Sequence, residues 1–305
     1  MVCLYQRTIK RPIEIKGIGL HTGLPAKVRL LPAGEYEGIN FLRNGEIIPA
    51  KVEYANGFAF STTLEKNGVK VKTVEHLLAA LYLTGIDNVY IEIDNEEVPI
   101  LDGSAKPFVE AIKSAGIQPL NEEKLYAVIN KRVKAGNWDK YIEGRPADSL
   151  IITYHASYNN DVIGNKAFTF EIDNRDDYLE ILSARTYCFL EEVEYLKQNG
   201  LAKGGSLENA VVIDGKNGCV VNPEGFRFKD EPIKHKALDL IGDLYLLGNP
   251  IIGEIYSYKG GHKLNAEFVK TLKENNAFDL KYASEVLSSI NEKKCLDFLS
   301  KVSIR

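Results

Sequence analysis

The side chains with the clearest chemical potential lie between Asp230 and Pro250, in DEPIKHKALDLIGDLYLLGNP. At about 100° per residue, a helix over this segment places His235, Asp239 and Asp243 along one stripe, while apolar residues cover most of the remaining surface. Such a helix is largely buried, and buried carboxylates and imidazoles need a positively charged or hydrogen-bonding partner. A metal ion on His235 and Asp239 would supply one. The alternative is a His/Asp pair on a solvated helix face.

A catalytic zinc typically has three protein ligands and a position for water, so a third ligand must come from elsewhere in the chain. His76 is the best candidate among the five histidines because it lies beside Glu75 at the start of a predicted helix, VKTVEHLLAALYLTG. Consecutive helical residues point about 100° apart, so one side chain can hold the metal while its neighbour takes a proton from water. This is the division of labour of a metal hydrolase.

Two further groups fit the same chemistry. His262 follows two glycines, which let the backbone approach a ligand and aim the imidazole inward. Asp243 could bond to that imidazole and favour its charged form, which stabilises an oxyanion or protonates a leaving amine. Lys236 adds positive charge at the rim, or is an ordinary solvated lysine. Spacing alone indicates a mononuclear metal hydrolase, although the HExxH motif of metalloproteases is absent.

The elements that must position these groups alternate between strands and helices. From Thr8 to about Val52 the pattern predicts antiparallel strands and turns, and in GIGLHTG a tight turn with a satisfied His21. The predicted helices span Val74–Leu83 (N-cap Thr73, end at Gly85), the stretch from Ser104 to Gly116, the stretch from about Glu191, the segment between its caps at Asp230 or Glu231 and Gly248, and the stretch from about Ala266. Strands followed by helices in both halves indicate α+β domains.

Composition restricts the class of protein. The chain has 305 residues, 45% hydrophobic and 26% charged, with a net charge of −4, as expected for two folded domains without a basic nucleic-acid surface. The polar stretch 118–125 is the candidate linker. Four scattered cysteines without a CxxC pair predict neither a disulfide framework nor a thiolate zinc site. The start of the chain lacks a signal peptide and no apolar run is long enough to span a membrane, so we expect a cytoplasmic protein.

Seven motifs carry a resemblance to a known family. In order along about residues 8 to 275 they are TVEHLLAAL, LDGSAKPF, ARTYCF, KGGSLENAVV, NPEGFRF, HKALDLIGDLYLLG and GGHKLN. With GIGLHTG near the start, this set resembles the zinc-dependent UDP-3-O-acyl-N-acetylglucosamine deacetylases of lipid A biosynthesis in Gram-negative bacteria. The match is highly specific because so many motifs keep their order over nearly the whole chain.

The resemblance implies roles for residues that match the motifs. Its Zn²⁺ ligands would be His76, His235 and Asp239. Glu75 would be the general base, and His262, oriented by Asp243, the general acid or electrostatic stabiliser. Thr186 would hydrogen-bond the tetrahedral oxyanion, and Lys236 would contact the phosphate or hexose region of the substrate. Tyr187, in the substrate-binding region, stands where the family usually has Phe, so the ring is kept while the local polarity changes.

The resemblance also implies the architecture. The family fold has two similar domains, each with a mostly antiparallel sheet and two helices, and the helix layers pack together between the sheets. The corresponding divisions are residues 1–122, 123–275 and a C-terminal tail, 276–305. A βαβ insert at about 187–221 would form an apolar passage for the 3-O-acyl chain. Its apolar residues, which ordinary core packing would also explain, are Leu190, Val193, Leu196 and Leu201.

The implied activity is hydrolysis of the 2-acetamido group of UDP-3-O-(3-hydroxyacyl)-N-acetylglucosamine to the free amine and acetate, an early committed step of lipid A biosynthesis. The expected partner is this acylated UDP-sugar, and we expect a monomer with at most peripheral membrane contact. Two alternatives remain: a deacetylase of another acetamido sugar, and a non-catalytic module that zinc stabilises. The second is disfavoured because a structural zinc has four closed protein ligands and needs neither Glu75 nor His262.

Overall fold

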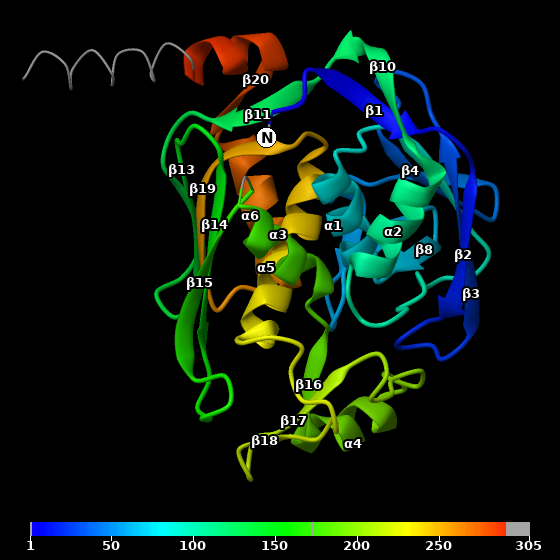
Figure 1. The fold of residues 1–305 in the computed structure, drawn as a ribbon, viewed down its shortest axis with the longest axis vertical. Coiled ribbons are helices and arrows are strands. Elements are labelled where there is room, and N and C mark those ends of the chain that lie inside the picture. The colour runs from blue at the N-terminus through cyan, green and yellow to red at the C-terminus, as the bar shows by residue number, and fades with distance from the viewer. Residues whose placement is uncertain (1, 173, 291–305) are drawn as a thin grey trace, which may run out of the picture.

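The computed structural model of the chain describes residues 2–172 and 174–290. Figure 1 shows its central helices lying between a sheet from the C-terminal half on one side and strands from the N-terminal half on the other. The helices are α1 (Glu75–Thr84), α2 (Lys106–Ala115), α3 (Arg175–Ser183), α4 (Leu190–Gln198), α5 (Glu231–Leu244) and α6 (His262–Glu274), with 3-10 turns η1 (Val52–Tyr54) and η2 (Tyr245–Leu247). Residues 283–290 are also helical.

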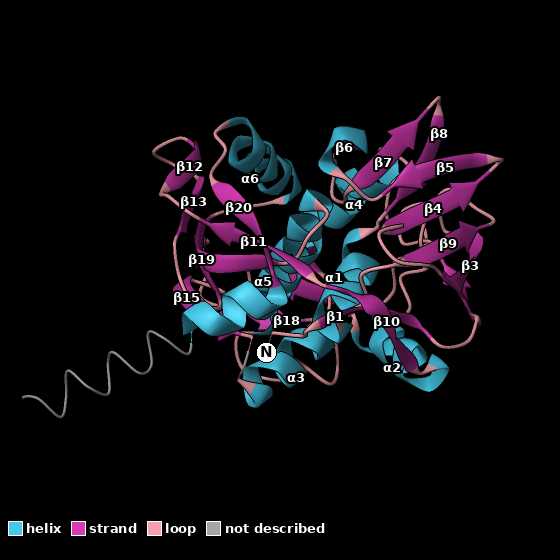
Figure 2. Cartoon of the chain, turned by 90° about the horizontal axis from the view of Figure 1, so that it is seen from above, coloured by secondary structure: helices cyan, strands magenta, loops and turns pink. Residues whose placement is uncertain are grey.

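The N-terminal half forms three sheets. The five-stranded sheet has the order β2 (Ile13–Ile18), β3 (Pro25–Pro32), β9 (Val89–Ile93), β4 (Ile39–Arg43) and β5 (Glu46–Pro49). Only its β4–β9 pair is parallel. The three-stranded sheet contains β6 (Ala55–Gly57), β7 (Thr63–Lys66) and β8 (Val69–Lys72). β1 (Tyr5–Ile9) pairs with β10 (Ile117–Glu123), as Figure 2 shows from above.

The C-terminal half contains a seven-stranded sheet in which β19 (Ile251–Tyr258) is a central strand. The strands are β11 (Leu125–Ile129), β12 (Val133–Gly136), β13 (Tyr141–Arg145), β14 (Leu150–Ser157), β15 (Asn165–Glu171), β19 (Ile251–Tyr258) and β20 (Phe278–Tyr282). β19 lies parallel to β11 and β14 and antiparallel to β13. The chain continues from β19 into α6, whose first residue is His262.

A small sheet projects from the bottom of the molecule in Figure 1. It contains β16 (Tyr187–Phe189), β17 (Val211–Asp214) and β18 (Cys219–Val220), and β16 and β17 are parallel with α4 between them. β16, α4 and β17 therefore form a βαβ unit within the segment 187–221, for which an insert was predicted.

The two helices that carry most of the candidate site pack against each other in the core. α1 buries Leu77, Leu78 and Leu81 completely, and each such side chain contributes about 2 kcal/mol of hydrophobic stabilisation. Every residue of α5 except Lys236 is buried. At Gly242 of α5, an added Cβ would lie 2.1 Å from the carbonyl oxygen of Glu75, so the two helices touch backbone to backbone. The absent side chain at Gly242 therefore sets their separation.

Predictions of helix ends succeed where they depend on glycine. α1 ends at Gly85 with a φ of 73°, and α2 ends at Gly116. Both are conformations that glycine adopts without steric cost. The predicted starts at about Glu191 and at Asp230 or Glu231 are confirmed within one residue, and Gly248 ends η2, which directly follows α5. The predicted start near Ala266 is wrong, because α6 begins at His262.

The predicted cap Thr73 is wrong because the N-cap of α1 is Val74, and Asp230 stands at the N-cap position of α5 but makes no side-chain capping bond. Both have positive φ, 57° and 60°, where a capping residue needs an extended conformation. The Thr73 hydroxyl instead donates to Glu97, and the Asp230 carboxylate accepts from Lys166. Ser104, the predicted cap of α2, accepts a hydrogen bond from the backbone N–H of the first helical residue at 3.2 Å.

The α+β class with mostly antiparallel sheets is confirmed. The candidate linker is mostly strand β10, because its polar residues pair with β1 at the surface. Part of the predicted C-terminal tail also belongs to a sheet, since β20 pairs with β11. The divisions at 122/123 and 275/276 stay predictions, and residues 291–305 of the tail lie outside the described residues.

Candidate metal and acid-base site

Two buried histidines and a buried aspartate meet between α1 and α5. His76 comes from the first turn of α1, and His235 and Asp239 lie one turn apart on α5. One ligand atom from each lies within 4.8 Å of the other two. Asp239 Oδ1 is 3.3 Å from His235 Nε2 and 3.5 Å from His76 Nε2. The three residues selected from the sequence as metal ligands are therefore neighbours in space.

The donor atoms of this cluster fit a zinc ion. His235 Nδ1 lies 2.9 Å from the carbonyl oxygen of Ala184, which can only accept, so Nδ1 carries the proton and Nε2 presents its lone pair toward Asp239. Burial lowers the pKa of His235 to about 3, so the imidazole is neutral. Asp239 Oδ1 and His76 Nδ1 are buried without a hydrogen-bond partner among the described residues. An imidazole–imidazole–carboxylate set is a typical zinc donor set.

Glu75 and His262 lie beside this cluster. Glu75 Oε1 is 4.0 Å from His262 Nε2, and the same nitrogen is 4.0 Å from Asp239 Oδ2. The predicted bond from His262 to Asp243 is present, with Nδ1 2.9 Å from Oδ2. Burial raises the pKa of Glu75. Burial alone would lower the pKa of His262, but the negative charges of Asp243 and Glu75 outweigh it and raise that pKa to about 9.

The candidate substrate-contacting residues, Thr186, Tyr187 and Lys236, line a cavity beside the cluster. Thr186 is half-buried and directly precedes β16, with its backbone N–H bonded to the carbonyl of Gly103 at 2.8 Å. Lys236 Nζ bonds Asp239 Oδ2 at 2.8 Å and lies 5.8 Å from the centre of the Tyr187 ring. Lys236 is therefore an ion-paired residue at the edge of the cluster and not a solvated surface lysine.

A cavity of about 380 Å³ opens next to the cluster. Its size is within the range of about 300–1,000 Å³ that is usual for small-molecule sites. The ligand cluster, Glu75 and His262 line one part of it, and apolar side chains of the insert line another. The insert residues include Leu190, Val193, Leu196, Leu207, Val212 and Val221. Leu201, which was also expected there, does not line it.

The turn GIGLHTG contributes more than the sequence indicates. His21 lines the cavity, and its Nε2 is buried without a partner among the described residues, so the histidine is only half satisfied. Glu97 holds this turn, because its fully buried carboxylate accepts from the backbone N–H groups of His21 and Thr22 at 2.8 and 2.7 Å. The glycines that flank His21 indicated the turn in the sequence, but nothing in the sequence indicated that Glu97 holds it.

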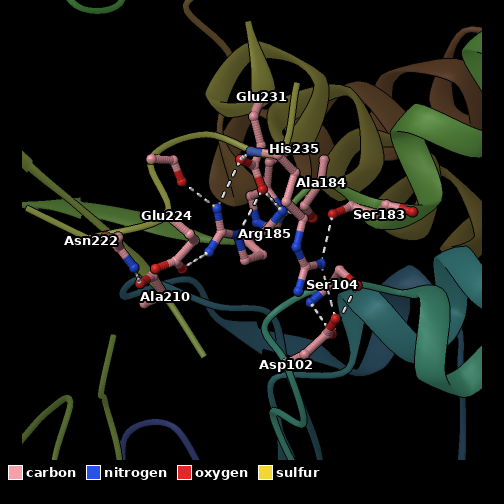
Figure 3. Close-up of polar contacts among 12 residues, drawn as sticks. Asp102, Ser104, Ser183, Ala184, Arg185, Ala210, Asn222, Glu224, Glu231 and His235 are labelled. Carbon is pink, nitrogen blue, oxygen red and sulfur yellow. Dashed lines mark hydrogen bonds and ion pairs between the residues drawn. The ribbon is translucent and has the colours of Figure 1, made fainter. Parts of the chain in front are cut away.

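A buried ionic network fixes the segment that contacts His235. Figure 3 shows Arg185 reaching Glu231 and Glu224. Its Nε and backbone N–H donate to Glu231 Oε1 at 2.9 and 3.0 Å, and its Nη1 donates to Glu224 at 2.6 Å. Glu231 lies one turn before His235 on α5, so a single helix holds both the histidine and the segment after α3 whose Ala184 carbonyl orients it. Sequence reasoning did not identify this network.

The network extends into the N-terminal half. Arg227 Nη1 donates to Asp102 Oδ2 at 2.9 Å and to the carbonyl of Ser183 at 3.0 Å. Asp102 in turn accepts from the Ser104 hydroxyl, as Figure 3 shows. The motifs LDGSAKPF, ARTYCF and NPEGFRF thus meet in one set of polar contacts.

Within the part of the chain that the structure describes, no helix combines the length and the apolar character needed to cross a membrane.

Comparison with known proteins gives consistent matches. The family described as UDP-3-O-acyl N-acetylglycosamine deacetylase matches residues 6–274. A UDP-3-O-acyl-N-acetylglucosamine deacetylase from Nautilia profundicola is 44% identical over 277 residues, which cover 90% of this chain and 94% of the relative. Proteins with the same name from Aquifex aeolicus and Nitratiruptor sp. are 44% and 43% identical, covering 88% and 92% of this chain and 92% and 94% of the relatives.

Proposed function

The chain belongs to the UDP-3-O-acyl N-acetylglycosamine deacetylase family, and we propose that it hydrolyses the 2-acetamido group of UDP-3-O-acyl-N-acetylglucosamine with the help of zinc. The products are the free amine and acetate, and the step belongs to lipid A biosynthesis. The observation that carries the proposal is the meeting of His76, His235 and Asp239 beside two further titratable groups, Glu75 and His262, at the wall of one cavity.

In this proposal the metal is held by the two histidines and the aspartate of the cluster. When bound, zinc would polarise the acetamide carbonyl and make the attacking water more acidic. Glu75 accepts the proton of that water, because it lines the cavity with Oε1 4.0 Å from His262 Nε2, while Oε2 is held by the backbone N–H of Thr62 at 3.0 Å. The raised pKa of Glu75, caused by burial, makes it a stronger base than an exposed carboxylate.

The remaining residues act on the carbonyl side of the reaction. His262, tied to Asp243 through Nδ1, presents Nε2 to the site and donates to the developing oxyanion. Thr186 adds a second donor from the edge of the insert. The amine then leaves after protonation by Glu75 or His262, since an unprotonated amide nitrogen is a very poor leaving group. Lys236, already paired with Asp239, contacts the phosphate or hexose region.

The apolar cavity supports the acylated sugar as substrate over other acetamido sugars. The apolar side chains that the insert contributes to the cavity provide a surface next to the reacting groups that suits a hydrocarbon chain. A comparison of kcat/KM for the UDP-sugar with and without its 3-O-acyl chain tests this point. Equal values would favour a deacetylase of another acetamido sugar.

Two variants test the chemistry. His235→Ala is expected to lose bound zinc and activity together, because the site then has two ligands. Glu75→Gln is expected to retain about one zinc per chain and lose at least about a hundredfold in kcat, the usual contribution of a general base. The measurements are metal analysis by mass spectrometry and acetate release. Full turnover by the Glu75→Gln protein would refute the assigned base, and zinc binding without any hydrolysis by the unmodified protein would favour the binding-module alternative.

A further inference from the structure

Thr62 is a completely buried residue that lies immediately before β7, far in the sequence from α5. Its backbone N–H donates to Glu75 Oε2 at 3.0 Å, and its hydroxyl donates to Asp243 Oδ1 at 2.6 Å. Its carbonyl accepts from the N–H of Val74, just before α1. One residue thus contacts a carboxylate from each of the two central helices.

The hydroxyl of Thr62 completes the environment of Asp243. This carboxylate is fully buried and accepts three hydrogen bonds, from Thr62 on Oδ1 and from His262 Nδ1 and Asn265 Nδ2 on Oδ2. The Thr62 bond is the one that Oδ1 receives among the described residues. Without it, a buried charged oxygen loses its partner and the carboxylate is free to tilt, which changes how it holds His262.

The backbone of Thr62 acts in the same way on Glu75. Since Oε2 is occupied by the Thr62 N–H, the remaining oxygen, Oε1, is the one that points to His262 Nε2 at 4.0 Å. The orientation of the carboxylate is therefore set by a backbone group that cannot rotate. A movement of Thr62 changes the base and the histidine together.

We propose that Thr62 is a positioning residue that fixes the base Glu75 and the Asp243–His262 pair relative to each other. This inference rests on the proposed hydrolytic function. Thr62 acts through these groups, and its hydrogen bonds among the described residues go to Glu75, Asp243 and Val74 and not to His76, His235 or Asp239, so we expect its effect on the chemical step and not on metal binding.

The test is Thr62→Val in the full-length, zinc-loaded protein. Valine keeps the branched shape and the backbone N–H but removes the hydroxyl. We expect kcat to fall about tenfold to a hundredfold, the effect of misplacing a catalytic group by a fraction of an ångström to an ångström. KM should stay within about twofold, and the zinc dissociation constant, measured by competition with a chelator, should not change. Thr62→Ser restores the hydroxyl and should recover most of kcat.

A matched control is Thr84→Val. Thr84 is also buried, but its hydroxyl bonds the carbonyls of Ala80 and Leu81 within its own helix, away from the site. This variant tests the loss of a buried threonine hydroxyl as such and should keep kcat. If Thr62→Val does not fold, Thr62→Ala takes its place and must show the same fall in kcat with unchanged zinc affinity.

Folded Thr62 variants with the kcat of the unmodified protein would overturn the proposal. So would an equal loss of kcat in the Thr84→Val protein, or a Thr62→Ser protein as slow as Thr62→Val. These results differ from a failure of the proposed function, in which the unmodified, zinc-loaded protein releases no acetate from the acylated UDP-sugar.

Discussion

Replacing Gly242 with alanine would push apart the two helices that build the site. The added Cβ would lie 2.1 Å from the Glu75 carbonyl oxygen and 3.2 Å from the backbone nitrogen of Ala79, and real Cβ atoms do not approach other atoms closer than 3.0 Å. α1 must therefore move by about 1 Å relative to α5, because backbone atoms on both sides cannot rotate away. His76 and Glu75 move with α1, while the other two proposed metal ligands stay on α5.

The expected consequences are large for the site and moderate for the fold. A displacement of about 1 Å costs about a hundredfold in rate. Overpacking in a core typically lowers the free energy of unfolding by about 1–3 kcal/mol. Zinc affinity should also fall, since the ligand from α1 no longer matches the pair on α5. The assays are acetate release, chelator competition and urea unfolding. Gly34→Ala is the control, because its added Cβ has no neighbour closer than 3.7 Å.

A Gly242→Ala protein with unchanged kcat and unchanged zinc affinity would refute this reasoning. It would mean that the separation of α1 and α5 is not set by their backbone contact, or that the site tolerates a shift of this size. Loss of stability alone, with both site measurements preserved, would show that the strain is absorbed elsewhere.

Two further predictions concern the buried residue Glu143 and the cavity. Hydrogen bonds from Arg132 and Arg145 lower the pKa of Glu143 in the folded protein. The ionised carboxylate therefore stabilises the fold above about pH 4.3, which is the pKa of the group in the unfolded chain. This stabilisation is lost as the pH falls through the lower pKa of the folded state. Glu143→Gln should therefore lower the free energy of unfolding by about 1 kcal/mol at pH 7 and by less at pH 4. The measurement is urea unfolding at both pH values, and an equal loss of stability at the two would contradict the prediction. Leu207 lines the cavity and is 38% exposed, so Leu207→Trp should narrow the cavity at little cost to folding. KM for the 3-O-acylated substrate should rise about tenfold while the unacylated sugar is unaffected, and an equal change for both substrates would argue against an acyl site.

The sequence predicted features that depend on neighbouring residues. The stripe His235, Asp239 and Asp243 follows from helical periodicity alone, and the glycine ends of α1 and α2 follow from the conformations that glycine permits. The pairing of β10 with β1 was not predicted, because a polar surface strand has no hydrophobic alternation to reveal it.

Features that depend on distant contacts were missed. Thr62 and Asp243 are 181 positions apart, and nothing in the local sequence FSTTLEK indicates a buried acceptor for the hydroxyl. The Thr73 cap failed for the same reason, since Glu97 competes for its hydroxyl from another part of the chain. That His76 lies beside α5 was predicted because a metal site needs a third ligand and because of the family resemblance. No feature of the sequence indicated the backbone contact at Gly242.

The insert has its own three-stranded sheet, whose strands pair only with one another among the described residues. Its apolar side chains line the cavity, while the proposed metal ligands, Glu75 and His262 lie on α1, α5 and α6, and Thr186 directly precedes the insert. Substitutions or length changes inside this unit should therefore alter which acyl chain fits while leaving bond cleavage intact. The arrangement is modular, and exchanging this segment between relatives would be a practical way to re-engineer chain-length preference.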